Sequence, residues 1–140
     1  MAFVEFKDVR KIYTMDEVQV AAVDGMSFEI EQGELVVVVG PSGSGKTTLI
    51  RTINALESID GGEIILYGED YLKGGAIVDK RQMRAGVRRI GMVFQQPIAF
   101  PHSIEKNLTY VLKYYGIRDK KVLSEKVEES LKKAKLYEEV

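Results

Sequence analysis

The chain has 140 residues, 45% hydrophobic and 29% charged, which is the balance of a soluble globular domain with one core. Its 20 Lys and Arg nearly balance its 21 Asp and Glu, so no overall positive charge draws it to nucleic acid or an anionic membrane. The lack of Cys excludes disulfides and thiolate metal sites, and no apolar run could cross a bilayer. Because the N-terminus lacks a signal-peptide pattern as well, we expect a cytoplasmic protein.

The first third of the chain has the pattern of short strands. Strands are predicted at residues 3–9, 18–23 and 26–30. Between the last two, Asp24-Gly25 is a hairpin-turn signal. Leu35–Val39 then forms a continuous apolar run bounded by glycines, which predicts a strand covered on both faces.

The middle of the chain alternates between helical and strand patterns. We expect a helix over 46–56, a strand over 63–67, a loop over 72–76, a basic helix over 80–89 and a second buried strand over 90–94. Helical spacing of apolar residues then predicts two helices, with Ser103 as the N-cap of the first and Gly116 as its stop. The second, from about Val122 to Ala134, carries mixed Lys and Glu on its other face, which is typical of a solvated surface.

One segment matches a phosphate-binding motif at every fixed position. The pattern G-x-x-x-x-G-K-[ST] is met by Gly40, Pro41, Ser42, Gly43, Ser44, Gly45, Lys46 and Thr47. A predicted strand ends before it and a predicted helix begins near Lys46, as the motif requires. Backbone N–H groups and the helix dipole would hold the phosphates, Lys46 would face the β- and γ-phosphates, and the Thr47 hydroxyl would bind Mg²⁺. The alternative is a Gly-Ser-rich turn that matches by chance.

Two further residues are candidates, each with an ordinary alternative. The ring of Tyr13, in the leading strand segment, could stack on an adenine base, or it could be a half-buried strand tyrosine. Gln95 follows the predicted strand 90–94, where ligands of α/β sheets bind. It could reach Mg²⁺ or orient a water, or it could be a loop Gln bonded to backbone.

Together these motifs resemble the ATP-binding cassette (ABC) family over essentially the whole chain. The resemblance covers an aromatic A-loop position (Tyr13), Walker A (Gly40 to Thr47, followed by Thr48) and the Q-loop (Gln95). It implies that Tyr13 stacks on adenine, that Walker A holds the phosphates, and that Gln95 senses the γ-phosphate. Lys46 and Gln95 would then serve catalysis, and Thr47 and Gln95 would bind the metal.

The resemblance also implies a fold and an assembly. The expected fold is an α/β P-loop NTPase core with an N-terminal antiparallel β subdomain and the beginning of a helical subdomain. The implied cofactors are ATP and Mg²⁺, and the implied partners are transmembrane permease subunits and a second ATP-binding subunit, with no nucleic acid. The chain would be peripheral at the inner face of the cell membrane. The sequence from Gln95 to Ile104 looks most like that of importer ATPases for phosphate or related oxyanions.

Several family motifs are absent. We find no signature loop, Walker B strand, catalytic Glu or switch His where they are expected. Val20–Asp24 imitates a Walker B strand but precedes the P-loop, so we interpret it as part of a hairpin. Ile77-Val78-Asp79 is too short to be the Walker B strand. His102 comes too early in the chain to be the switch His. We therefore predict an incomplete domain over 1–140, divided at 95/96, that is not hydrolytic alone. A transporter ATPase, a non-transport ABC protein and a non-catalytic nucleotide-binding module stay open.

Overall fold

The computed structural model describes residues 2–75 and 79–139. It divides into two compact units, Met1–Met92 and Val93–Val140, whereas the sequence predicts a boundary after Gln95. Each unit is described by itself. The predicted loop over 72–76 and the short segment from Ile77 to Asp79 lie partly outside the described residues. No helix in the described ranges is long and apolar enough to span a membrane.

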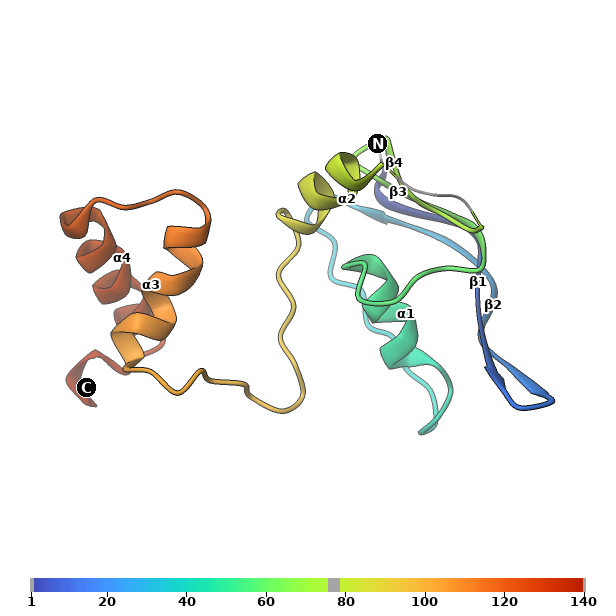
Figure 1. Ribbon diagram of the computed structural model, residues 1–140, viewed down its shortest axis with the longest axis horizontal. Coiled ribbons are helices and arrows are strands. Elements are labelled where there is room, and N and C mark those ends of the chain that lie inside the picture. Colours follow the sequence, from blue (N-terminus) through green and yellow to red (C-terminus); the bar gives the residue numbers. More distant parts are fainter. Residues whose placement is uncertain (1, 76–78, 140) are drawn as a thin grey trace. The chain divides into compact units, whose positions relative to one another are not determined.

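The first unit is built on an antiparallel sheet (Figure 1). Its strands are β1 (Ala2–Met15), β2 (Val18–Glu31), β3 (Gly61–Leu66) and β4 (Glu69–Lys73), in the order β2-β1-β3-β4. The hairpin between β1 and β2 turns at residues 16–17, where Asp16 has a positive φ of 53°. The predicted turn at Asp24-Gly25 is wrong, because β2 runs through both residues. Gly25, with φ of 64°, instead lies where the β1–β2 register shifts, and this bulge uses the same left-handed backbone as a turn.

A bulge in β1 changes which residues face the core. Val4 and Phe6 are buried in the first part of the strand, and Val9 and Lys11 in the second, so the alternation skips one position. The skip falls at Asp8, which has φ of 48° and lies where the pairing with β2 shifts. Since side chains alternate with a period of two, one extra residue moves the following odd-numbered residues to the core face.

Helices α1 (Lys46–Ile53) and α2 (Lys80–Val87) add to the core of this unit, and Figure 1 shows them alongside the sheet. The buried cluster comprises Val4, Phe6, Val9, Val23, Leu49, Ile59, Ile64, Leu66, Tyr71 and Leu72. Both helices begin where the sequence predicts and end earlier than predicted. Helix α1 stops at Ile53 because Ala55 adopts a left-handed φ of 56° and its N–H returns to the Thr52 carbonyl.

Three strand-and-loop predictions in this part of the chain are wrong. Leu35–Val39 is not a strand and is 41–89% exposed, and the predicted strand 90–94 is also irregular, although Ile90 packs against the core. An apolar run becomes a strand only when a neighbouring strand accepts its backbone hydrogen bonds, and among the described residues none does so here. Leu72 and Lys73, by contrast, belong to β4, because Leu72 pairs with Ile64.

The second unit contains the two predicted helices, which are confirmed. They are α3 (Ile104–Tyr114) and α4 (Lys120–Lys133), followed by the 3-10 turn η1 (Tyr137–Glu139). The Ser103 hydroxyl accepts a hydrogen bond from the Lys106 N–H, as expected of an N-cap, and Gly116 has φ of 94° just beyond α3.

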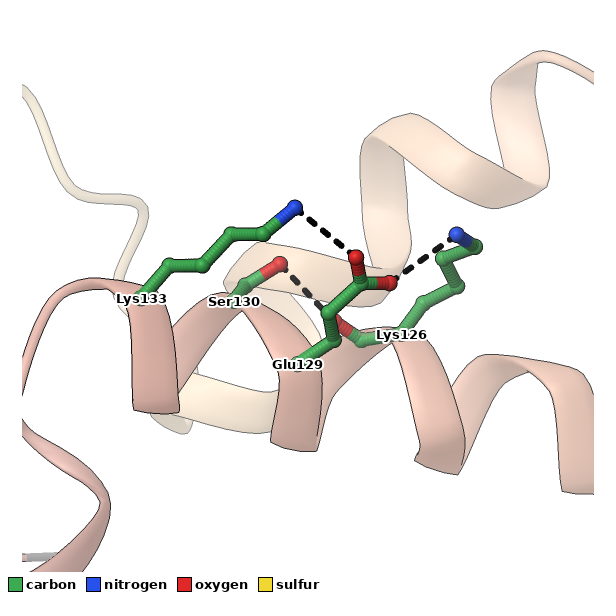
Figure 2. A network of polar contacts seen from close by, with 4 residues as sticks. All are labelled: Lys126, Glu129, Ser130 and Lys133. Atoms are coloured by element: carbon green, nitrogen blue, oxygen red, sulfur yellow. Dashed lines mark hydrogen bonds and ion pairs between the residues drawn. The ribbon is translucent and has the colours of Figure 1, made fainter.

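The polar face of α4 carries a network of charged side chains (Figure 2). The Glu129 carboxylate lies 3.0 Å from the Lys126 ammonium and 2.8 Å from that of Lys133. Hydrogen bonds from Lys133 and Lys126 lower the pKa of Glu129 to about 2. All three side chains are exposed, so water screens the pairs and their contribution to stability is small. The prediction that this is a solvated face is confirmed.

Candidate nucleotide-binding site

The glycine-rich loop from Gly40 to Gly45 leads directly into α1. Gly43 and Gly45 have φ of 81° and 84°, which side chains other than glycine rarely adopt. A Cβ on Gly45 would overlap the Ala22 carbonyl oxygen of β2, so the loop lies directly against that strand. The Ser44 N–H donates to the Pro41 carbonyl at 3.3 Å, which closes the loop on itself. The glycines are therefore required both for the turn and for the close approach to β2.

The N-terminus of α1 differs from those of the other helices. Asp79, Ser103 and Asp119 cap α2, α3 and α4 through side-chain oxygens that accept backbone N–H groups. Gly45 stands at the N-cap of α1, and no side chain of the described residues caps it. Its first turn also carries no acidic residue. The first N–H groups of this helix and the positive end of its dipole are therefore left for an anion.

Lys46, the first residue of α1, folds its side chain back over the loop. Its ammonium donates to the carbonyl oxygens of Gly40 and Pro41, both at 2.7 Å, and to the Ser44 hydroxyl at 3.3 Å. No carboxylate accepts from it among its described hydrogen bonds and ion pairs. The positive charge is thus held at the loop by neutral acceptors, which phosphate oxygens could replace with a stronger, charge-assisted interaction.

A cavity of about 360 Å³ lies beside the loop. It is lined by Ala21, Ala22, Val23, Asp24, Met26, Val38, Val39, Ser44, Gly45, Lys46 and Leu49. The phosphate loop and β2 thus form two walls of one space, and Ala21 to Asp24, within the segment that imitates a Walker B strand, supply part of the second wall. The loop side of the cavity combines a lysine ammonium with uncapped N–H groups, which fit the phosphate groups of a nucleotide, whereas the β2 side carries the Asp24 carboxylate.

The residues predicted to bind Mg²⁺ lie in different units. Thr47, in the first turn of α1, is exposed, and Thr48 next to it is half-buried. Gln95 is exposed in the irregular segment of the second unit, before α3. Within the described ranges no group of three or more His, Asp or Glu side chains could hold a metal ion. A metal here would therefore need oxygens from a nucleotide as well as the Thr47 hydroxyl.

Tyr13 lies near the tip of the β1–β2 hairpin, where it pairs with Val20 of β2. Its ring is half-buried, and the Lys11 ammonium lies 5.4 Å from the ring centroid. This contact was not predicted from the sequence. The available signal is the spacing of two residues on one strand, which places Lys11 and Tyr13 on the same face.

Replacing Gly45 with alanine is expected to damage the loop more than the same change at Gly43. Both positions have a positive φ, so each alanine carries strain of about 1–2 kcal/mol. Only at Gly45 does the new Cβ also meet backbone, the Ala22 carbonyl, whereas nothing lies within 4 Å at Gly43. Urea unfolding should show a larger loss of unfolding free energy for Gly45→Ala than for Gly43→Ala. Equal losses in the two variants would show that the loop does not lie against β2.

Comparison with known proteins identifies the family of this chain. The sequence profile of the ABC transporter family matches residues 23–139. This chain belongs to the ABC transporter family. This chain is 41% identical over 135 residues to the phosphate import ATP-binding protein PstB 2 of Ligilactobacillus salivarius. The match covers 96% of this chain and 52% of that protein. It is 44% identical over 124 residues to PstB 2 of Bacillus subtilis, covering 85% of this chain and 44% of the other. It therefore spans about half the length of these relatives.

Solved ABC cassettes have the same fold. The dimeric ATP-binding cassette MJ0796 bound to ADP and Pi matches this chain with a TM-score of 0.77 and 31% identity. The match covers 94% of this chain and 57% of the MJ0796 chain. A second dimeric structure of MJ0796, described as a bacterial ABC transporter cassette, matches with a TM-score of 0.75 at 28% identity. The predicted fold class, an ABC-type P-loop core with an antiparallel β part and helices, is confirmed.

Proposed function

We propose that this chain is the nucleotide-binding part of an ABC transporter ATP-binding subunit that binds Mg-ATP through the loop from Gly40 to Thr48. The observation that carries the proposal is the uncapped N-terminus of α1, with the Lys46 ammonium held over the loop before it. An anion placed there gains backbone donors, the helix dipole and a charge at once. The ADP and Pi in the cassette structure at 31% identity support a nucleotide as that anion.

Within this proposal, particular residues bind the base, bind the metal and serve catalysis. Tyr13 stacks on adenine, Thr47 and Gln95 contribute oxygens to Mg²⁺, and Gln95 orients water at the γ-phosphate. The metal neutralises charge on the phosphates when bound. Lys46 supplies the point charge at the β- and γ-phosphates, and binds them by exchanging its carbonyl partners for phosphate oxygens.

The transported solute that we propose is phosphate. The support is the identity of about two residues in five to the phosphate import ATP-binding proteins of two bacteria. The partners would then be transmembrane permease subunits and a second ATP-binding subunit, the latter supported by the dimeric cassettes. This assembly would place the chain at the cytoplasmic face of the membrane.

We also propose that the chain alone binds ATP without hydrolysing it. The carboxylates of its second helical segment, Glu125, Glu128 and Glu129, lie on the exposed face of α4. Lys132 and Lys133 already pair with two of them, so they are engaged on the solvated face. Hydrolysis needs a water-orienting base beside the phosphates, and these residues are poor candidates for it.

Calorimetry and phosphate release together test these proposals. We expect saturable binding of Mg-ATP, and phosphate release no higher than that of a Lys46→Ala control, which reports contaminating ATPase. Lack of ATP binding would overturn the nucleotide site. A steady turnover on the order of 1 per second, lost in the control variant, would show that a catalytic carboxylate is present after all.

Removal of the Tyr13 ring tests how the base is held. Tyr13→Ala is expected to weaken Mg-ATP binding by about 1–3 kcal/mol, the range for losing one base–aromatic stack, and Tyr13→Phe to change it little. Isothermal titration of the three proteins measures this. Equal affinity of the wild type and Tyr13→Ala would make Tyr13 an ordinary strand residue.

A further inference from the structure

We propose that Lys11 is a positioning residue for the nucleotide base. It holds the Tyr13 ring from one side and joins the strand that carries this ring to the loop that follows the P-loop helix. The inference rests on the proposed function, in which Tyr13 stacks on the base, and it assigns a role to a buried charge that phosphate binding does not use.

Lys11 is a buried cation with three partners. Only 8% of the residue is exposed. Its ammonium donates to the Ser58 hydroxyl at 3.0 Å, lies 3.6 Å from the Asp60 carboxylate, and lies 5.4 Å from the centroid of the Tyr13 ring. Burial removes water from around an ammonium group, and these partners replace part of it. These partners come from two separate parts of the chain.

Asp60 makes further contacts with the same stretch of β1. Its carboxylate accepts a hydrogen bond from the Ile12 N–H at 2.7 Å, and its own N–H donates to the Arg10 carbonyl at 2.8 Å. Asp60 lies in the connection between the end of α1 at Ile53 and the start of β3 at Gly61. The loop after the P-loop helix is therefore bonded to three successive residues of β1, just before Tyr13.

These contacts matter because the sheet no longer supports β1 at this point. Strand β3 pairs with β1 between Val4 and Arg10, and beyond Arg10 only β2 accompanies it. The remaining two-stranded ribbon is largely exposed, with Met15, Val18 and Val20 open to solvent. An isolated two-stranded hairpin is at best marginally stable. The position of the Tyr13 ring therefore depends on Lys11 and Asp60.

This geometry predicts that removing the Lys11 charge weakens the contact with the base and leaves the contact with the phosphates unchanged. A ring held by Lys11 presents a fixed surface for stacking, and a ring released with its ribbon must be ordered when the base binds. The phosphates are held at the other end of α1, by Lys46 and the N-terminal N–H groups. Tripolyphosphate, which has no base, should therefore bind equally well whether or not Lys11 is charged.

The test compares Mg-ATP with Mg-tripolyphosphate as ligands of the full chain in calorimetry. Lys11→Met keeps the aliphatic side chain and removes the charge, and we expect it to weaken ATP binding by about three- to tenfold, as for losing a desolvated cation–π contact. Tripolyphosphate binding should not change. In a Tyr13→Ala background the same substitution should have no further effect on ATP, since coupled residues are not additive. Lys11→Arg should restore most of the affinity.

Two variants separate positioning from general damage. Lys7→Met removes an exposed charge from the part of β1 that pairs with β3 and should leave the binding of both ligands unaffected. Asp60→Asn keeps an acceptor for the Ile12 N–H but removes the charge beside Lys11, and it should repeat the selective loss if Lys11→Met does not fold. Equal weakening of both ligands by Lys11→Met, or an unchanged ATP affinity, would overturn the inference. If the wild type binds tripolyphosphate as tightly as ATP, the base stacking itself is wrong, and if it binds neither, the proposed function fails.

Discussion

The substitution Lys46→Ala is expected to weaken Mg-ATP binding by about 2–4 kcal/mol, the range for truncating one partner of a buried charge contact. The ammonium already lies at the loop, 2.7 Å from the Gly40 and Pro41 carbonyls. Alanine leaves the phosphate charge without its cation, while the backbone N–H groups of α1 still bind. Binding should therefore weaken strongly and not vanish. Isothermal titration calorimetry measures the difference.

A second lysine serves as the matched control. Lys73 ends β4 and forms an exposed ion pair with Glu63 at 3.7 Å, so Lys73→Ala removes the same charge and side chain from the same unit. We expect it to leave the ATP affinity unchanged. Equal ATP affinity of the wild type and Lys46→Ala would refute the P-loop assignment. A loss of the same size in Lys73→Ala would show that overall charge, and not this site, holds the nucleotide.

The largest loss of stability is expected for Phe6→Ala. Phe6 is 1% exposed, and its ring stacks on that of Phe28 with 4.4 Å between centroids and 15° between planes. Truncation removes buried apolar surface and leaves a cavity in the buried cluster of the first unit. Such substitutions lower the free energy of unfolding by about 3–5 kcal/mol. Urea denaturation followed by circular dichroism reports this loss.

An exposed apolar residue on the same sheet provides the comparison. Val18 begins β2 and is largely open to solvent, so Val18→Ala should change the free energy of unfolding by no more than about 0.5 kcal/mol. A small loss for Phe6→Ala, close to that of the control, would mean that the described core does not account for the stability of the first unit.

The features that the sequence predicts well are those set by neighbouring residues. The P-loop motif places a glycine at each position where a side chain would be strained, and Lys46 begins α1 as expected. Ser103 and Gly116 likewise delimit α3 through contacts within a few residues. In all these cases the partner group lies in the same turn or helix, so the local pattern contains the whole interaction.

The features that the sequence predicts poorly depend on distant partners. Asp24-Gly25 has the composition of a turn, but whether the left-handed glycine reverses the chain or forms a bulge is decided by the pairing of β2 with β1. Leu35–Val39 has the side chains of a buried strand, yet a strand requires a neighbour to bond to its backbone. The spacing of Lys11 and Tyr13 places them on one face, but the polar partners of Lys11 could not be predicted, because Ser58 and Asp60 lie 47 and 49 residues away.

The change in support along β1 has a consequence for its motions. Between Val4 and Phe6 the strand has hydrogen-bonded neighbours on both sides, so its amide protons should exchange with solvent only through extensive unfolding. The Ile12 N–H is held by the Asp60 carboxylate, but from Tyr13 to Met15 β2 is the paired neighbour in the described sheet, and local opening of the ribbon is enough to expose amides there. In the proposed complex a nucleotide stacked on Tyr13 covers the part of β1 that should exchange faster, and it is expected to slow that exchange. Lys11 and Asp60 hold the ribbon as far as Ile12, so the ordering that a bound nucleotide adds is confined to the residues beyond it.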